Sequence, residues 1–129
     1  MSGGGNDLRQ ELHEFDVCVL GSGAAGLAAA FSAAQGGCKV LVIEKAPVFG
    51  GSTAISGGVV WIPCNAEMKD VGIDDSPDAA RAYLRNVLGN RYREDLVESF
   101  LAHGPEMVDF IHRHSELRLV PRALAPDYY

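Results

Sequence analysis

Two short apolar runs near the start of the chain are separated by a stretch of small residues. Residues 15–20 and 39–44 are each nearly continuously apolar, which is typical of strands buried on both faces of a parallel sheet. Residues 24–35 between them carry no charge and many alanines, and Gly36-Gly37 follows. This stretch predicts a helix buried on most sides and ended by a glycine cap. Strand, helix and strand together predict one βαβ unit with parallel strands and a right-handed crossover.

After the second apolar run the pattern loses its regularity. Residues 46–58 are rich in glycine, serine and threonine, which predicts a loop with at most short turns of helix. Residues 59–63 form a short apolar piece that we expect to be extended and to line a pocket. Residues 1–14, before the first run, are polar and contain three consecutive glycines, and they predict a flexible tail.

The rest of the chain shows helical spacing of its apolar residues. Ser76 and Pro77 are expected to open a helix as its N-cap and first residue. A second helix is predicted from about Glu94, and Gly104-Pro105 is expected to break it before a third helix. Residues 117–120 fit a short strand, and a loop is expected after them.

These patterns predict an incomplete α/β fold with a helical extension. The three expected parts are a tail (1–14), a βαβ unit with its loop (15–63) and a helical segment (64–129). A chain of 129 residues is long enough for one domain, but only two strands of a larger sheet are recognisable. We therefore expect an N-terminal fragment of a longer protein.

The composition disfavours several classes of function. The chain has 11 basic and 17 acidic residues and a net charge of -6, whereas a nucleic acid partner needs a basic surface. The first residues lack the basic and apolar regions of a signal peptide, and glycines interrupt the longest apolar stretch too often for a transmembrane segment. The three cysteines have no CxxC spacing, so we expect no metal site, no disulfide framework and reduced thiols in the cytoplasm.

A glycine-rich fingerprint joins the first predicted strand to the first predicted helix. Residues 21–26 have the sequence GSGAAG, and Glu44 ends the second strand. In this motif Gly21 permits the tight turn, Gly23 lets a pyrophosphate approach the backbone, and Gly26 lets the helix pack close to the sheet. The helix N-terminus offers free N–H groups to phosphates, and the carboxylate accepts hydrogen bonds from ribose hydroxyls. A glycine turn without a ligand is the alternative, which the strand, helix, strand and acid in order disfavour.

The fingerprint alone does not separate NAD from FAD, but the loop after Glu44 favours FAD. Residues 50–58 have the sequence GGSTAISGG, with two glycine pairs flanking hydroxyl side chains. Such a loop offers N–H and O–H groups to a diphosphate, a ribityl chain and an isoalloxazine edge. An NAD domain normally passes into another helix or strand at this point. FAD is therefore the predicted cofactor, and a flexible surface loop is the weaker alternative.

These residues carry a resemblance to a known family. Residues 15–58 resemble the N-terminal FAD-binding segment of the fumarate reductase and succinate dehydrogenase flavoprotein superfamily, the FAD-dependent oxidoreductase 2 superfamily. Within it the chain is most similar to the 3-ketosteroid Δ1-dehydrogenase branch, in the segments GGSTAISGGVVWIP (50–63), AYLR (82–85), PEMV (105–108) and PDY (126–128). The resemblance implies a Rossmann-like βαβ FAD-binding domain of the glutathione reductase type.

The resemblance also implies a role for each matching position. The glycine turn would contact the FAD diphosphate, the acid after the second strand would bind the adenosine ribose, and the loop would approach the diphosphate, the ribityl chain and the flavin ring. Some members of the superfamily attach FAD covalently through a histidine just before the loop threonine. Ser52 stands there in this chain, so we predict noncovalent FAD. The implied cofactor-binding residues are Gly21, Ser22, Gly23, Ala25, Gly26, Glu44, Lys45, Ser52, Thr53, Ser56, Gly57 and Gly58.

For catalysis, the resemblance points to the end of the chain. The branch oxidises a ring bond next to a ketone: a hydride passes from one carbon to flavin N5, and a tyrosine helps remove a proton from the neighbouring carbon. Tyr128, in the segment PDY, matches one of the branch's active-site tyrosines. A phenol with a pKa of about 10 must be positioned and its phenolate stabilised for this step. Tyr129 is an alternative, and so is a packing role for Tyr128.

Two histidines near the end of the helical segment could in principle be metal ligands. His112 and His114 are two residues apart, a spacing that puts them on different faces of a helix. We therefore expect both to be exposed helix residues that hold no metal.

Three hypotheses for function follow. The first is the N-terminal FAD-binding part of a dehydrogenase that introduces a C=C bond next to the ketone of a ketosteroid, with an unidentified electron acceptor. The second is a fumarate-reductase-like flavoprotein acting on a small acid, although no cluster of arginine and histidine for carboxylates is visible. The third is a noncatalytic, truncated nucleotide-binding fragment. Under the first two hypotheses the chain is part of a longer enzyme, and we expect the 129 residues alone to be inactive.

Overall fold

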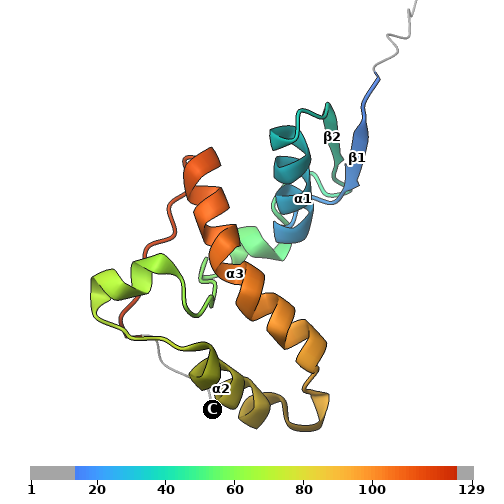
Figure 1. Ribbon diagram of the computed structural model, residues 1–129. Helices are drawn as coiled ribbons and strands as arrows, with labels where there is room; N and C mark the ends of the chain where they lie inside the picture. Colours follow the sequence, from blue (N-terminus) through green and yellow to red (C-terminus); the bar gives the residue numbers. More distant parts are fainter. Residues whose placement is uncertain (1–13, 125–129) are drawn as a thin grey trace, which may run out of the picture. The chain divides into compact units, whose positions relative to one another are not determined.

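The computed structural model describes residues 14–124, and Figure 1 shows their helices and strands. They form two compact units, of which the first extends to Val59 and the second begins at Val60. This boundary falls a few residues before position 63, where the sequence pattern placed it. The expected tail, apart from Glu14, and the expected active-site Tyr128 lie outside the described residues.

The first unit contains the predicted βαβ arrangement. Its elements are β1 (Val17–Leu20), α1 (Ala24–Gln35) and β2 (Val40–Ile43). The strands pair in parallel with Val17 opposite Val40, and α1 lies against both of them (Figure 1). The predicted strand, helix and strand are thus confirmed: the helix has the expected ends, and each strand is shorter than expected by two residues.

The apolar side chains of the first unit are less buried than the pattern predicted. In its described part Val19 and Ala30 are buried, whereas Leu20 is 80% exposed and Leu27 is 44% exposed. The expectation of strands buried on both faces and of a helix buried on most sides is therefore wrong for these residues. The physical reason is that a single helix covers only one face of a two-stranded sheet, and the sheet covers only one side of the helix. The opposite face of the sheet and the opposite side of the helix stay exposed to solvent.

The loop after β2 contains a short 3₁₀ helix, η1 (Gly51–Ile55), which confirms the predicted loop with short helical turns. Gly50 precedes η1 with a φ of 106°, a conformation that residues with a side chain rarely adopt. Gly50 itself is buried, while the residues of η1 are exposed. The residues of η1 are therefore accessible to solvent, while the residue before them is buried.

The second unit is helical. Its elements are η2 (Ala66–Val71), α2 (Pro77–Leu88), η3 (Gly89–Arg91) and α3 (Glu94–His114). The predicted start of α2 is confirmed, because the Ser76 hydroxyl accepts a hydrogen bond from the N–H of Ala79 at 3.2 Å and Pro77 is the first helical residue. Residues 59–63 form no strand. The ring of Trp61 instead lies 6.0 Å from that of Phe100.

The helix α3 runs without a break through Gly104 and Pro105, so the expected break and third helix are wrong. Proline in a helix interior removes a hydrogen bond and costs roughly 3 kcal/mol. The cost is offset because one apolar face continues across this point, formed by the buried residues Val97, Leu101, Gly104 and Val108. A helix that ended at Gly104 would carry Val108 away from this face.

The core of the second unit lies between α2 and α3. Its buried residues are Ala80, Val97 and Leu101, and the partly buried residues packed against them are Leu84, Tyr92 and Phe100. Beside this cluster the guanidinium of Arg81 on α2 donates two hydrogen bonds to Glu98 on α3, at 2.5 and 2.8 Å. These hydrogen bonds raise the pKa of Arg81 and lower the pKa of Glu98.

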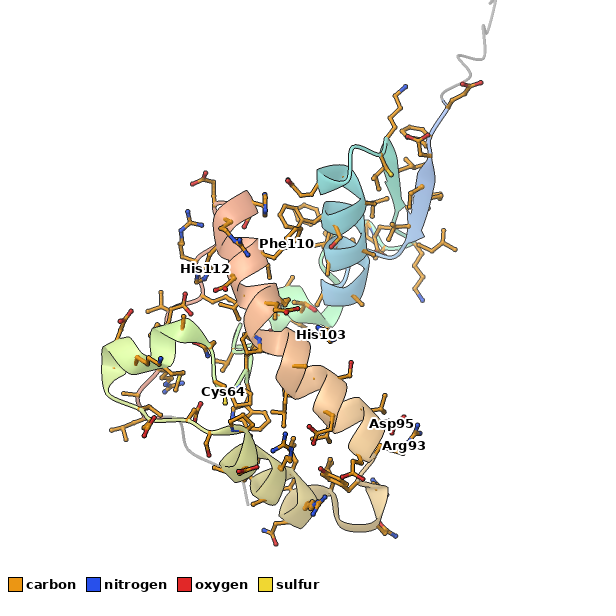
Figure 2. The ribbon with its side chains drawn as sticks, viewed as in Figure 1. Cys64, Arg93, Asp95, His103, Phe110 and His112 are labelled. Atoms are coloured by element: carbon orange, nitrogen blue, oxygen red, sulfur yellow. The ribbon has the colours of Figure 1, made fainter. Side chains whose placement is uncertain are left out.

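The segment after α3 contains no strand in its described part, so the expectation for residues 117–120 is wrong. Its backbone is held by a side chain instead: the N–H of Leu119 donates to Nε2 of His112 at 2.9 Å. On its other side, Nδ1 of His112 lies 2.9 Å from Oε1 of Glu67 in η2. His112, on the last turns of α3 (Figure 2), is therefore only 19% exposed, and the expectation that it is exposed is wrong. His114 is exposed, as expected.

Candidate functional site

The turn between β1 and α1 brings two backbone segments into contact at Gly26. A β-carbon added at Gly26 would lie 2.0 Å from the carbonyl oxygen of Gly21 and 3.5 Å from Cγ1 of Val19. No side chain fits there, which is the close packing of helix and strand that the fingerprint requires. Gly23 differs, because a β-carbon there would meet no atom within 4 Å. The space beside Gly23 is open to a ligand.

The N-terminus of α1 follows directly from this turn. Because α1 begins at Ala24, the N–H groups of its first turn have no acceptor within the helix. The N–H of Ala24 donates to Oγ1 of Thr53 in η1 at 3.1 Å. Ala25 and Gly26 belong to the same first turn, which carries no acidic side chain. The positive end of the helix dipole therefore makes the N-terminus of α1 favourable for binding an anion.

Glu44 follows β2, and three hydrogen bonds hold its carboxylate. Oε2 accepts one from the Ser22 hydroxyl at 2.6 Å and one from the Ser22 N–H at 2.9 Å. Oε1 accepts one from the N–H of Ala46 at 2.9 Å. These bonds, and above all the one from the Ser22 hydroxyl, lower the pKa of Glu44 to about 2. At neutral pH the group is a carboxylate and a hydrogen-bond acceptor, as a ribose-binding acid requires.

The loop after β2 is fastened to the glycine turn. The N–H of Gly50 donates to Oγ of Ser22 at 2.8 Å, and Thr53 binds the first N–H of α1. The backbones also approach closely, since a β-carbon at Gly51 would lie 3.4 Å from Cα of Gly23. The turn, the acid after β2 and the loop are therefore one connected arrangement, although Ser22 and Gly50 are 28 positions apart in the chain.

The structure joins half of the residues that the sequence predicted for the cofactor through contacts between segments. Within the loop, the Ser56 hydroxyl donates to the carbonyl oxygen of Thr53 at 2.8 Å and accepts from the N–H of Gly58 at 3.2 Å. Lys45, Ser52 and Gly57 are exposed on the same segments. The predicted residues joined through contacts between turn, acid and loop are Gly21, Ser22, Gly23, Gly26, Glu44 and Thr53. Tyr128 lies outside the described residues.

Two contributors were missed by the sequence analysis. The N–H of Ala46 helps to hold Glu44, and the N–H of Gly50 binds Ser22. Backbone donors have no side-chain signature, so neither was recognisable as such. A signal was present at Ser22, however, because it is the one polar residue in the sequence GSGAAG.

The described residues fit a dinucleotide. The open space at Gly23 and the first turn of α1 suit a diphosphate, and the ionised Glu44 suits a ribose. Among residues 14–124, no three His, Cys, Asp or Glu side chains gather as they would around a metal ion. No described helix is long and apolar enough to cross a membrane. Fold and site together define a dinucleotide-binding α/β unit.

Comparison with known proteins identifies the family within this class of dinucleotide-binding proteins. A family model described as FAD binding domain matches residues 16–126, and the chain therefore belongs to this family. The predicted FAD cofactor and the predicted resemblance to ketosteroid dehydrogenases are thereby confirmed, as is an incomplete α/β FAD-binding fold.

Two relatives and one solved structure illustrate the similarity. The chain is 47% identical over 118 residues to the 3-oxosteroid 1-dehydrogenase of Mycobacterium tuberculosis, covering 92% of this chain and 21% of that protein. It is 41% identical over 114 residues to the 4-oxocyclohexanecarboxylate 2-dehydrogenase of Sinomonas cyclohexanicum, covering 88% and 20%. The structure of 3-ketosteroid Δ1-dehydrogenase from Sterolibacterium denitrificans, in complex with 1,4-androstadiene-3,17-dione, matches with a TM-score of 0.72 and 41% identity, covering 81% and 18%. The chain spans about a fifth of the length of these relatives.

Proposed function

We propose that this chain is the N-terminal FAD-binding part of a flavin-dependent dehydrogenase of the 3-oxosteroid 1-dehydrogenase kind, which introduces a C=C bond next to the ketone of a ketosteroid. The observation that carries the proposal is the 47% identity over 118 residues with the enzyme of that name from Mycobacterium tuberculosis. Because the chain spans only about a fifth of that relative, we propose that catalysis also needs the parts that the relative has beyond the aligned region.

The finer assignment of the cofactor site is part of the same proposal. We infer a Rossmann-like domain of the glutathione reductase type, with FAD held noncovalently because a serine precedes Thr53 where a covalent attachment would need histidine. The first turn of α1 would hold the diphosphate, Glu44 would accept hydrogen bonds from the adenosine ribose, and the loop would offer its N–H and O–H groups to the ribityl chain and the flavin. The residues assigned to these roles are Gly21, Ser22, Gly23, Ala25, Gly26, Glu44, Lys45, Ser52, Thr53, Ser56, Gly57 and Gly58.

The contribution of these residues is binding and orientation. Bound FAD supplies the acceptor for the hydride that leaves the substrate. The N–H groups at the start of α1 offset the charge of the diphosphate, and Thr53 keeps η1 beside that helix end. Tyr128 removes the proton from the carbon next to the one that loses the hydride. An ordinary phenol pKa of about 10 means that Tyr128 needs hydrogen-bond donors around it to act at neutral pH.

The proposed setting is cytoplasmic, with a ketosteroid as substrate and an electron acceptor whose identity is open. The three cysteines are free thiols, which suits a reducing compartment. The net charge of -6 argues against a nucleic acid partner.

The test of the proposal is a substrate-dependent change in the flavin spectrum. The intact protein is expected to be yellow, and addition of a 3-ketosteroid without oxygen is expected to bleach the flavin absorbance. A small ring keto acid, 4-oxocyclohexanecarboxylate, serves as the comparison substrate. Bleaching by the keto acid alone would favour the small-acid alternative, which the 41% identity to a dehydrogenase of that compound supports. A colourless protein would favour a noncatalytic fragment.

The mode of cofactor attachment has its own measurement. After denaturation in acid, the flavin is expected to remain in solution when the protein is removed, because no histidine stands at position 52. Flavin that stays with the precipitated protein would contradict noncovalent binding.

The role of Tyr128 is tested by Tyr128→Phe in the intact protein. Loss of the phenol is expected to slow flavin reduction by roughly 10²–10⁴-fold without changing the spectrum of the bound flavin. Tyr129→Phe removes the adjacent hydroxyl and is the matched control, with an unchanged rate expected. An unchanged rate in Tyr128→Phe would dismiss the catalytic role.

A further inference from the structure

Ser22 occupies an unusual place for a residue of a glycine-rich turn. Its side chain is 2% exposed and is the most buried polar side chain of the described chain. The neighbouring glycines are half-buried, and the following Ala24 and Ala25 are exposed. A buried hydroxyl costs free energy unless it both donates and accepts hydrogen bonds. The hydrogen-bond partners of Ser22 therefore indicate why a polar residue is buried here.

The Ser22 hydroxyl satisfies both of its hydrogen-bonding functions within the chain. It donates to Oε2 of Glu44 at 2.6 Å and accepts from the N–H of Gly50 at 2.8 Å. One hydroxyl therefore connects three segments: the turn before α1, the end of β2 and the residue before η1. Alanine offers neither function, and threonine would add a methyl group to a position that is already closed to solvent.

The two carboxylate oxygens of Glu44 accept different numbers of hydrogen bonds. A carboxylate has about four lone-pair sites, two on each oxygen. Oε2 already accepts two hydrogen bonds, both from Ser22. Oε1 accepts one, from the N–H of Ala46. It is therefore the oxygen at which a further donor, such as a ribose hydroxyl, would find an acceptor.

We propose that Ser22 is a positioning residue for the FAD site, whose buried hydroxyl holds Glu44 by Oε2 and Gly50 by its N–H so that the ribose acceptor and the flavin loop are in place before the cofactor binds. This inference rests on the proposed function as far as FAD is concerned. It differs from a direct contact of Ser22 with the diphosphate, because here Ser22 acts through Glu44 and Gly50. A preformed site binds more tightly, since less ordering is needed when the ligand arrives.

The test compares Ser22→Ala with Ser32→Ala in the intact protein. Ser32 lies on the exposed side of α1, so its variant makes the same chemical change without touching the cluster. In Ser22→Ala we expect the FAD dissociation constant to rise at least tenfold, the Gly50 amide to lose protection from hydrogen exchange, and the Glu44 carboxyl, followed by ¹³C NMR, to titrate at higher pH. Ser32→Ala is expected to leave all three unchanged.

A double variant distinguishes positioning from direct contact. If Ser22 acts through Glu44 and Gly50, Ser22→Ala with Glu44→Gln is expected to lose clearly less FAD affinity than the sum of the two single losses, because only the part that acts through Gly50 adds to the loss in Glu44→Gln. Fully additive losses of affinity would overturn the proposal in favour of a direct contact. Unchanged FAD affinity in Ser22→Ala, with the Gly50 amide deprotected, would overturn it in favour of a purely structural role.

A measurement on the unchanged protein covers the case in which Ser22→Ala does not fold. In the protein freed of flavin, the Gly50 amide is expected to be protected to the same degree as after FAD is added back. An amide that becomes protected only with FAD would overturn the preformed site. An unchanged protein that binds no FAD would overturn the proposed function, and this inference with it, whereas failure of the inference alone leaves the unchanged protein able to bind FAD.

Discussion

Among the described residues, the first unit buries the polar side chain of Ser22, which is 2% exposed, whereas the second unit buries the apolar side chain of Val108, which is 3% exposed. The serine makes two side-chain hydrogen bonds to segments distant in the chain. Val108 continues the apolar face of α3 that also carries Val97 and Leu101. The first unit thus has a buried hydrogen-bonding centre, and the second has a buried apolar one.

The difference follows from what each unit has to provide. Hydrogen bonds are directional and fix donor and acceptor positions closely, which suits a unit that presents N–H groups and a carboxylate to a cofactor. Apolar burial has no direction and contributes stability in proportion to area, which suits a pair of packed helices. Substitutions in the first unit should therefore affect ligand binding in addition to folding, whereas those in the second unit should affect the free energy of unfolding.

The largest effect is expected from Gly26→Ala. Its β-carbon would lie 2.0 Å from a backbone oxygen of Gly21, so α1 and β1 would have to separate. We expect loss of the folded first unit by circular dichroism and loss of FAD binding by flavin fluorescence. Gly23→Ala is the matched variant: its β-carbon meets no atom within 4 Å, so it should fold and yet bind FAD more weakly. Normal FAD binding by Gly26→Ala would contradict the close-packed turn.

A large effect on stability is expected from Leu101→Ala in the second unit. Removing a side chain that is only 9% exposed leaves a cavity and is expected to lower the free energy of unfolding by about 2–5 kcal/mol. Leu96→Ala, on the same helix but at a position 59% exposed, is the control and should cost about 0.5 kcal/mol. Chemical denaturation measures both. Equal losses would show that α3 has no buried face.

A more moderate effect is expected from Glu44→Gln, and it depends on pH. The folded pKa of Glu44 is lowered from about 4.5 to about 2, so its hydrogen bonds stabilise the first unit above about pH 4.5. This contribution is lost as the pH falls towards about 2. Glu44→Gln should weaken FAD binding about tenfold at neutral pH, as expected for loss of a charged hydrogen-bond partner. It should also remove the acid sensitivity in this range.

The control for this pH dependence is Glu116→Gln, which changes an exposed glutamate. It should leave both FAD affinity and the acid profile unchanged. Melting curves recorded between neutral and acid pH provide the measurement, and an unchanged profile in Glu44→Gln would contradict the carboxylate network.

The smallest effect is expected from Arg81→Met, which removes the link between α2 and α3. Both side chains of the pair with Glu98 are partly exposed, at 32% and 42%, so solvent and salt screen their attraction. We expect a small fall in melting temperature, smaller still at high salt, and the fall should not add to that of Glu98→Gln. Because the folded pKa of Glu98 is lowered, the pair stabilises at neutral pH and is lost as the pH falls through that lowered value.

Arg91→Met changes an exposed arginine of η3 and is the control for loss of positive charge. A fall in melting temperature equal to that of Arg81→Met would mean that net charge, and not the pair with Glu98, is responsible.

The sequence was most informative where the signal is local. The apolar runs and the small-residue stretch between them predicted β1, α1 and β2 because each pattern lies within one element. Ser76 before Pro77 predicted the start of α2 for the same reason. The spacing from Gly21 to Glu44 predicted the class of cofactor, since turn, helix and acid have fixed positions in a βαβ unit.

By itself the sequence determined the βαβ unit, the glycine turn and the acid that follows it, because these depend on residues close together in the chain. The tertiary structure decided what depends on residues far apart. The helix α3 continues past Pro105 because its apolar face, which includes Val97, Leu101 and Val108, is buried on both sides of the proline. The proline by itself had predicted a break. Contact with Glu67 and Leu119 buried His112. The hydrogen bonds of Ser22 to Glu44 and Gly50 formed only because folding brings three separate segments to one buried hydroxyl.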